Sequence, residues 1–330
     1  MTAIPRYDGE AYLRRLRETE QPFHHEYLAM YSSVLGGIVT DPVLMTVPVD
    51  DHGVHRGDAV FETLKAVDGA VYNLEAHLGR LFGSAAAIGL SPVPARAEIA
   101  RILLDTLSVA GCPDAHVRVL VTRGPGSLSV NPYECPVPGL YLIVQAAKTT
   151  FMERCPGGAS AGAATVEAKP GWQAQIKSCN YLQNAMMKKE AVDRELDFVF
   201  AFDENRHLAE SATENVGIID DARRLRVPAA ESVLAGTTML RVLQLAQTLV
   251  EDGILVEVFR GAIPEPDVVA AREILVFGTT TDVTSVTRYG GQPIGGGTPG
   301  PVGAALQRLL LDDIRSNPDM RTTFTPAVSP

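Results

Sequence analysis

The most informative stretch of the 330-residue chain is Ile176-Lys177-Ser178-Cys179-Asn180-Tyr181-Leu182. It places a lysine directly after an apolar residue and just before a predicted helix over 180–194. Desolvation disfavours the ammonium form of a lysine, and the neutral amine is then available as a nucleophile. Considered alone, a lysine is more often a solvated surface charge, and we interpret Lys169, Lys188 and Lys189 in that way.

A carboxylate and two Gly-Thr turns follow Lys177 along the chain. Glu210 opens the run ESATEN (residues 210–215), in which Glu214 is a competing acid. Gly236-Thr237-Thr238 begins a predicted helix over 237–252, and Gly278-Thr279-Thr280 follows an apolar segment. A helix N-terminus offers free N–H groups to a phosphate, although a plain N-cap is the commoner role of a threonine there. A lysine, an acid and phosphate-binding turns are together the groups that hold pyridoxal 5′-phosphate.

Arg80 is a further candidate for the phosphate site. It lies one helical turn after His77 in a predicted helix over 75–88. Its guanidinium has the planar fork that matches a phosphate dianion. The ordinary alternatives are a surface arginine at Arg80, a surface acid at Glu210 and a plain loop at Gly278.

The composition limits the class of protein. Hydrophobic residues make up 46% of the chain and charged residues 21%, which is typical of a globular protein. The net charge of −10 (29 − 39) argues against a nucleic-acid partner. No apolar run approaches the ~18 residues that span a bilayer, so we expect no membrane segment. The N-terminus lacks a signal-peptide pattern, and the four scattered cysteines fit reduced thiols without metal-type spacing, so we expect a cytoplasmic protein without a metal site.

The hydrophobic pattern predicts an α+β protein, because strands and helices mix without regular βαβ alternation. We predict a helical N-terminal extension over 1–34, a small domain over 35–150 and a larger domain over 151–330. Predicted helices cover 9–30, 75–88, 94–110, 180–194, 237–252 and 302–314. Predicted strands cover 59–67, 70–74, 116–122, 139–145, 159–166, 198–202, 216–220, 224–228, 255–259 and 273–277, with β-like composition over 32–41 and 43–49.

Taken together, these residues resemble the class IV (fold type IV) pyridoxal-phosphate enzymes. That family comprises branched-chain and D-amino-acid aminotransferases, (R)-amine transaminases and aminodeoxychorismate lyase. The resemblance covers roughly residues 35–315 in order. Its motifs are GDAVFET (57–63), HLGRL (77–81), the Lys177 stretch, ESATEN (210–215), GTT (236–238), GTT (278–280) and GPV (300–302).

The resemblance implies a smaller N-terminal α/β domain, a larger β-rich C-terminal domain and a homodimer with the cofactor in the cleft between domains. Lys177 would form the Schiff base with pyridoxal 5′-phosphate and shuttle the proton. Glu210 would pair with the pyridine nitrogen and Tyr181 with the phenolic oxygen. The phosphate would be held by Arg80, Thr237, Thr238 and Thr279.

Substrate contacts are implied at Thr280, Phe61 and Lys65, and Lys65 has an equal alternative as a strand-edge surface lysine. Tyr181 resembles the branched-chain enzymes, which favours apolar amino donors and a 2-oxo acid acceptor. Thr63 and Lys65 depart from the Gly and Arg typical of branched-chain enzymes. The loop over 123–138 lacks the Arg-x-His group of D-amino-acid aminotransferases.

The leading prediction is therefore an amino-acid aminotransferase. One alternative is an aminodeoxychorismate lyase-like enzyme, which would use the same lysine and release pyruvate without a keto-acid acceptor. A second is a cofactor-binding or regulatory protein that has lost catalysis, and intact Lys177 and Glu210 argue against it. A third is an unrelated α+β protein with coincidental motifs, which the number and order of the motifs oppose.

Overall fold

The structure is a computed structural model that describes residues 4–327. The chain divides into two compact units. The first comprises Met1–Val71, Leu90–Ala147 and Thr323–Pro330, and the second comprises Tyr72–Gly89 and Lys148–Thr322. The boundary predicted after residue 150 lies close to Ala147, but the segment 72–89 groups with the second unit. Residues 1–3 and 328–330 of the predicted domains lie outside the described residues.

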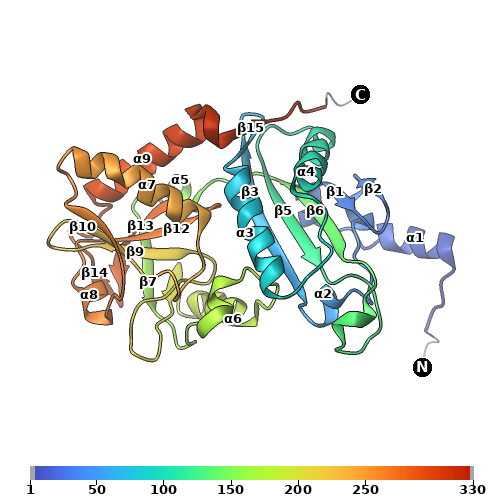
Figure 1. Cartoon of the computed structure of the whole chain (residues 1–330), viewed down its shortest axis with the longest axis horizontal. Helices are drawn as coiled ribbons and strands as arrows, with labels where there is room; N and C mark the ends of the chain where they lie inside the picture. The colour runs from blue at the N-terminus through green and yellow to red at the C-terminus, as the bar shows by residue number, and fades with distance from the viewer. Residues whose placement is uncertain (1–3, 328–330) are drawn as a thin grey trace. The chain divides into compact units, whose positions relative to one another are not determined.

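The first unit is built on a seven-stranded sheet with the order β15-β4-β3-β5-β6-β1-β2 (Figure 1). Helix α4 (Arg96–Ala110) packs on β1 and β6. The shorter helices are α1 (Gly9–Arg17), α2 (His52–His55) and the 3₁₀ turns Pro22–Glu26, Pro42–Leu44 and Pro132–Glu134. The strands are β1 (Tyr27–Ser32), β2 (Gly37–Val39), β3 (Ala59–Val67), β4 (Ala70–Tyr72), β5 (Ala115–Thr122), β6 (Gly139–Ala146) and β15 (Arg321–Thr323).

The turn at Asp68-Gly69 sets the register of the first hairpin. Both residues have positive φ, at 50° and 68°, as the two-residue turns that match strand twist require. The pairing Val67↔Ala70 and Ala66↔Val71 follows directly from that turn. The strands predicted over 59–67 and 70–74 therefore pair as a hairpin across this turn.

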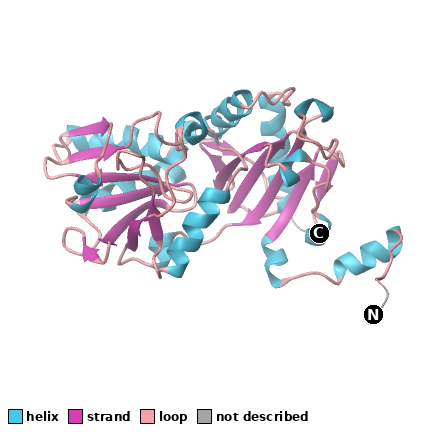
Figure 2. Cartoon of the chain, turned by 90° about the horizontal axis from the view of Figure 1, so that it is seen from below, coloured by secondary structure: helices cyan, strands magenta, loops and turns pink. Residues whose placement is uncertain are grey.

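The N-terminal segment corrects the predicted helical extension. The helix predicted over 9–30 ends at Arg17, and Tyr27–Ser32 is a strand of the sheet. Pro22 explains the break, because proline lacks an N–H and disfavours helical geometry in the residue before it. Helix α1 has no buried residue and lies away from the sheet of its unit (Figure 2). The β-like composition over 43–49 is also wrong as a strand, since Pro42–Leu44 forms a 3₁₀ turn.

The second unit is built on a mixed sheet with the order β11-β10-β9-β12-β13-β7-β8, and β14 pairs with β13 (Figure 1). The strands are β7 (Ala159–Ala163), β8 (Phe198–Phe200), β9 (Asn215–Ile219), β10 (Arg224–Val227), β11 (Glu257–Arg260), β12 (Glu273–Gly278), β13 (Asp282–Tyr289) and β14 (Gln292–Pro293). The helices are α3 (Leu74–Ala87), α5 (Phe151–Arg154), α6 (Leu182–Asp193), α7 (Thr237–Glu251), α8 (Glu265–Val269) and α9 (Pro301–Ser316), with 3₁₀ turns at Gly171–Gln175 and Pro318–Met320.

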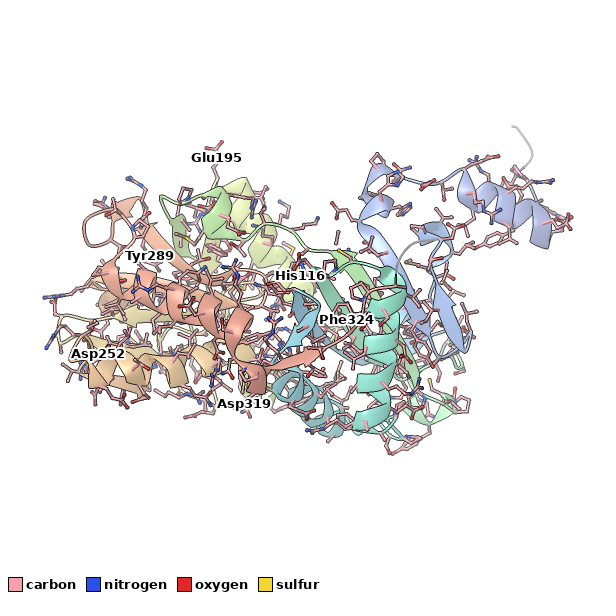
Figure 3. The ribbon with its side chains drawn as sticks, turned by 90° about the horizontal axis from the view of Figure 1, so that it is seen from above. His116, Glu195, Asp252, Tyr289, Asp319 and Phe324 are labelled. Carbon is pink, nitrogen blue, oxygen red and sulfur yellow. The ribbon has the colours of Figure 1, made fainter. Side chains whose placement is uncertain are left out.

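Strand β13 has no counterpart in the sequence prediction. Four of its buried positions are polar or charged, so the strand does not have the pattern of an apolar run: Asp282, Thr284, Ser285 and Thr287. Its Tyr289, labelled in Figure 3, stacks on Phe200 with ring centroids 5.7 Å apart. Neighbouring strands on both sides bury β13, and tertiary packing therefore outweighs its composition.

Helices α7 and α9 pack against each other and contact strand β12. A buried ion pair joins them: Arg241 of α7 donates to Asp313 of α9 through Nε at 2.8 Å and Nη2 at 2.5 Å. Asp313 also accepts hydrogen bonds from Tyr72 and Asn317. Such a pair is strongly destabilising when one partner is lost, so it fixes the position of α7, whose first turn carries Thr237 and Thr238.

Candidate active site

Lys177 lies in the second unit between the 3₁₀ turn Gly171–Gln175 and helix α6. Its side chain is buried, with 9% exposure. Its backbone N–H donates to Ser84 Oγ of α3 at 3.2 Å, and its Nζ lies 3.5 Å from Tyr181 Oη. The lysine is therefore held by its backbone while its amine meets a phenol. The structure brings together Lys177 and Tyr181, as the sequence predicts.

Glu210 is the second member of this group. Its Oε2 accepts a hydrogen bond from the backbone N–H of Leu234 at 3.3 Å. Burial raises the pKa of the Glu210 carboxyl, and the positive charges of Lys169 and Lys177 oppose that rise. The competing acid Glu214 instead accepts from the backbone N–H of its neighbour Thr213 at 3.1 Å. Because the charge of Lys177 acts on Glu210, Glu210 rather than Glu214 is favoured as the acid near Lys177.

Lys169 corrects a prediction made from the sequence. The sequence favours a solvated charge at this position, but the Lys169 Nζ lies 4.9 Å from the centroid of the Tyr181 ring. Burial lowers the pKa of Lys169, and the charge of Glu210 opposes the fall. Nothing in the run Ala168-Lys169-Pro170 distinguishes this lysine from a surface one. Its place beside Tyr181 and Glu210 follows from the path of the chain alone.

The first turn of α7 carries Thr237 and Thr238, which are 5% and 8% exposed. No side chain caps this helix at Gly236, so its leading N–H groups have no side-chain acceptor there. Arg80 of α3 donates through Nη1 to the carbonyl of Ala235 at 3.0 Å. Arg80 thus lies beside the uncapped end of α7, as a phosphate site requires.

One stripe of α3 faces these groups. His77, Arg80 and Ser84 follow each other at i, i+3 and i+7, which places them on one side of a helix. His77 Nε2 lies 3.2 Å from Thr237 Oγ1, Arg80 bonds Ala235, and Ser84 bonds the Lys177 backbone. His77 and Ser84 are absent from the sequence candidates, although their spacing from Arg80 is a signal that could indicate them.

Gly236 has a steric reason to be glycine. A Cβ built there would lie 1.8 Å from Asn215 Oδ1. Asn215 cannot move away freely, because its Nδ2 donates to the carbonyl of Leu234 at 2.9 Å. We expect Gly236→Ala to lower the free energy of unfolding by about 1–3 kcal/mol and to displace the first turn of α7. Urea unfolding tests the first effect, with Gly79→Ala as the control because a Cβ there meets no atom within 4 Å.

Thr279 and Thr280 form the turn between β12 and β13, and this turn belongs to the same unit. Thr279 is partly buried, whereas Thr280 is exposed. Gly278 closes the turn by pairing with Asp282, which has a φ of 54°. The two threonines therefore lie in a tight hairpin, whereas the sequence predicts only a turn after the strand ending at Phe277.

Phe61 and Lys65 lie on β3 of the first unit. Lys65 is 7% exposed and β3 is an interior strand, so its interpretation as a strand-edge surface lysine is wrong. Lys65 is paired across the sheet with His116 of β5, which is labelled in Figure 3. On the same face, the Arg118 guanidinium lies 5.5 Å from the centroid of the Phe61 ring. The sequence candidates lack His116 and Arg118, and the period-2 spacing of the predicted strand 116–122 is the signal that could indicate them.

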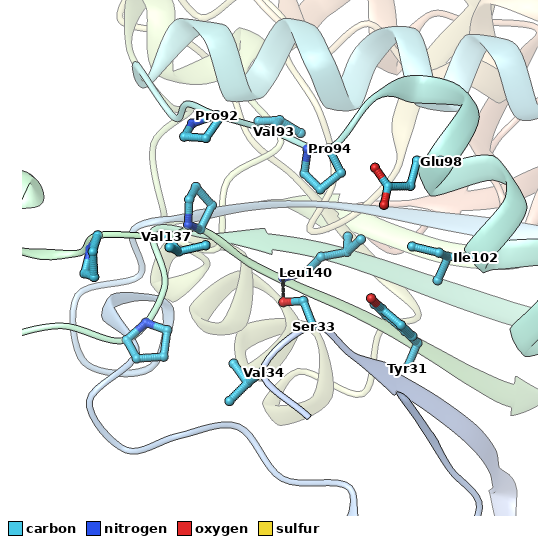
Figure 4. A pocket seen from close by; sticks show the side chains of 13 residues that line it. Tyr31, Ser33, Val34, Pro92, Val93, Pro94, Glu98, Ile102, Val137 and Leu140 are labelled. Atoms are coloured by element: carbon cyan, nitrogen blue, oxygen red, sulfur yellow. Dashed lines mark hydrogen bonds between the residues drawn. The ribbon is translucent and has the colours of Figure 1, made fainter. Parts of the chain in front are cut away.

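A separate cavity of about 530 Å³ lies in the first unit (Figure 4). Prolines and apolar side chains dominate its lining, and Ser33 Oγ accepts from the Leu140 N–H at 2.9 Å on its wall. Glu98 is its one acidic or basic lining residue. Its lining contains no lysine, so the cavity lacks an amine that could form a Schiff base.

Two features are absent from the described residues, 4–327. Among them, no group of three or more His, Cys, Asp or Glu side chains has the arrangement of a metal site. Over the same range, no helix has the length and apolarity to span a bilayer.

The arrangement in the second unit fits pyridoxal phosphate. The uncapped N-terminus of α7 next to Arg80 suits a phosphate dianion. The desolvated Glu210 carboxylate suits a cationic N–H donor such as a pyridinium. The buried Lys177 amine suits an aldehyde carbon.

Comparison with known proteins points the same way. Residues 59–289 match the family model described as amino-transferase class IV. The chain is 37% identical to the D-amino-acid transaminase, chloroplastic, of Arabidopsis thaliana over 303 residues, which are 91% of this chain and 80% of that protein. It is 30% identical to a putative branched-chain-amino-acid aminotransferase of Methanocaldococcus jannaschii, covering 84% of this chain and 94% of that protein.

A solved structure shares the fold. The branched-chain amino acid aminotransferase of Escherichia coli superposes with a TM-score of 0.80 at 23% sequence identity, covering 90% of this chain and 99% of that one. The fold type IV architecture predicted from the sequence is therefore confirmed. With the family model matching from β3 to β13 and the lysine, the acid and the two Gly-Thr turns in order along it, the chain belongs to the class IV aminotransferases, which depend on pyridoxal 5′-phosphate.

Proposed function

We propose that Lys177 carries the catalysis of this aminotransferase and that Tyr181, Glu210, Arg80, Thr237, Thr238 and Thr279 hold its cofactor. The observation that supports this most directly is the 3.5 Å distance between the buried Lys177 Nζ and Tyr181 Oη. Lys177 also interacts electrostatically with Glu210. When bound, pyridoxal phosphate supplies an electrophilic carbon and an electron-withdrawing ring that makes the Cα proton of an amino acid acidic.

Proton transfer and the stabilisation of charge are assigned to separate residues of the chain. Lys177 Nζ would accept the Cα proton of the substrate as a general base. As a general acid it would then donate the proton to the carbon that the cofactor contributes. Its backbone hydrogen bond to Ser84 fixes the point from which the side chain extends, and the amine itself meets Tyr181 Oη. Tyr181 Oη is a hydrogen-bond partner for the Lys177 amine, and Glu210 provides the negative charge that keeps a ring N–H protonated.

For the amino donor, we propose an amino acid with an apolar side chain and a 2-oxo acid as acceptor. Tyr181 supports this choice, because it matches a tyrosine of the branched-chain enzymes. Lys65, His116 and Arg118 form a basic cluster on one face of the first sheet, and such a cluster suits a substrate carboxylate. Phe61 provides an apolar surface beside Arg118. In the second unit, the family resemblance implies a substrate contact at the backbone amide of Thr280.

A second candidate is a D-amino acid donor. The name of the 37%-identical Arabidopsis relative favours it, although the loop over 123–138 lacks an Arg-x-His group. The relatives named above are transaminases, which does not favour the lyase alternative. We also propose a homodimer, on the basis of the family resemblance, and a cytoplasmic location, which four free cysteines support.

A donor panel tests this proposal. The purified holoenzyme is mixed with matched L- and D-amino acids in the absence of an acceptor, and the visible absorption of the bound cofactor is recorded. We expect the visible band to disappear with apolar donors of one configuration, because the amino group is transferred to the cofactor. Loss of the band with D-amino acids alone would favour the second candidate. Repeated turnover of aminodeoxychorismate to pyruvate with no acceptor present would contradict the transaminase assignment.

A further inference from the structure

We propose that His77 is a positioning residue that orients the hydroxyl of Thr237 toward the cofactor phosphate. The inference rests on the proposed phosphate site at the N-terminus of α7 and deepens it by one residue. His77 would not touch the phosphate itself. It would act through the hydrogen bond that it shares with Thr237.

The contact is well protected from water. His77 Nε2 lies 3.2 Å from Thr237 Oγ1, and the two residues are 2% and 5% exposed. In a buried setting a hydrogen bond is not exchanged for one to solvent, so its direction is fixed by its protein partners. The orientation of the Thr237 hydroxyl therefore depends on which atom of this pair carries the hydrogen.

The donor and acceptor capacities of the three groups determine the direction of the hydrogen bond between His77 and Thr237. A phosphate dianion only accepts hydrogen bonds, and a threonine hydroxyl has one hydrogen and lone pairs that accept. If Thr237 donates its hydrogen to the phosphate, its oxygen must accept from His77. His77 must then carry a hydrogen on Nε2. An unprotonated Nε2 would instead draw the Thr237 hydrogen toward itself and away from the phosphate.

The helix that carries His77 supports a positioning role. His77, Arg80 and Ser84 form one stripe of α3, and the other two contact Ala235 and the Lys177 backbone. All three contacts reach residues at or beside the proposed site. A purely space-filling histidine would need neither this stripe nor a hydrogen bond to a threonine at the first position of α7.

The test uses the full chain with its cofactor removed. Equilibrium dialysis gives the dissociation constants of pyridoxal phosphate and of pyridoxal, which lacks the phosphate, for wild type, His77→Leu, His77→Gln and Thr237→Val. We expect His77→Leu to weaken pyridoxal phosphate binding about five- to tenfold and to leave pyridoxal binding unchanged. His77→Gln should bind as wild type does, because its amide N–H can take the place of Nε2–H.

A double variant isolates the coupling. In the Thr237→Val background, His77→Leu should have no further effect on pyridoxal phosphate binding, because the hydroxyl through which it acts is gone. An undiminished effect there, or equal weakening of pyridoxal and pyridoxal phosphate, would overturn the proposal. If His77→Leu does not fold, His77→Asn replaces it, since its shorter amide cannot reach the Nε2 position and should also bind weakly.

The same measurements separate this inference from the site on which it rests. If Thr237→Val and Arg80→Met weaken pyridoxal phosphate binding but His77→Leu does not, only the role of His77 fails. If neither Thr237→Val nor Arg80→Met affects pyridoxal phosphate binding, the assignment of the phosphate site fails, and the role of His77 with it.

Discussion

Lys177→Ala is expected to reduce aminotransferase turnover by at least about 10⁴-fold while leaving the protein folded. Lys169 also lies beside Tyr181, with its Nζ 4.9 Å from the centroid of the ring, whereas the amine at Tyr181 Oη belongs to Lys177. The fold should survive, since the bond to Ser84 uses the backbone N–H of residue 177, which alanine retains. Removing a buried lysine also removes the cost of desolvating its charge.

Two measurements check this expectation. Turnover is followed with the donor that the panel identifies, and the visible absorption of the purified variant is compared with that of wild type. Lys189→Ala is the matched control, because Lys189 lies on α6 with a 63% exposed side chain paired with Asp193. The control should retain full activity. Turnover of Lys177→Ala within tenfold of wild type would refute the role assigned to Lys177.

Local signals explain which parts of the fold the sequence predicts. The Asp68-Gly69 turn requires positive φ at both residues, and that requirement is visible in the dipeptide. Helix α7 begins at Thr237, as Gly236-Thr237 indicates. In each case neighbouring residues alone determine the geometry. The helix predicted over 9–30 is wrong because that prediction followed the apolar spacing and not the local break at Pro22.

Tertiary contacts explain what the sequence does not predict. Strand β13 is polar in composition and is identified only by the strands that bury it. Lys169 and Lys177 are eight positions apart (177 − 169), yet both act electrostatically on Glu210. His77 meets Thr237 across 160 positions. Motifs thus indicate the residue types of the site, whereas its supporting hydrogen bonds depend on how α3 and α7 pack.

Glu210→Gln is expected to have opposite effects on activity and on stability. Turnover should fall by about 10²–10³-fold, because a neutral amide cannot hold the positive charge of a ring N–H. The cofactor-free variant should nevertheless melt at a higher temperature than cofactor-free wild type at neutral pH. The reason is that burial raises the pKa of Glu210 even against the charges of Lys169 and Lys177, so its ionised form costs stability.

The pH dependence follows from the direction of that shift. A carboxyl with a raised pKa in the folded state binds its proton longer there than in the unfolded chain. Its contribution to stability is fully present below the ordinary glutamate pKa of about 4.3 and is lost as pH rises through the raised value. Glutamine does not titrate. The difference in melting temperature between Glu210→Gln and wild type should therefore be small in acid and should grow as pH rises toward neutrality.

Thermal melts across this pH range, with and without pyridoxal phosphate, separate the two effects. Adding the cofactor should raise the melting temperature of wild type more than that of Glu210→Gln, because the carboxylate then gains a cationic partner. Glu214→Gln is the control, because Glu214 accepts a hydrogen bond from its neighbour Thr213. This variant should show neither the higher melting temperature without cofactor nor the smaller stabilisation by the cofactor. Equal stabilisation of wild type and Glu210→Gln by the cofactor would show that the buried carboxylate does not face the ring nitrogen. A residue that weakens the empty protein and strengthens the loaded one is what a site built for a cationic ring requires, and Glu210 is the residue of this chain at which that trade can be measured.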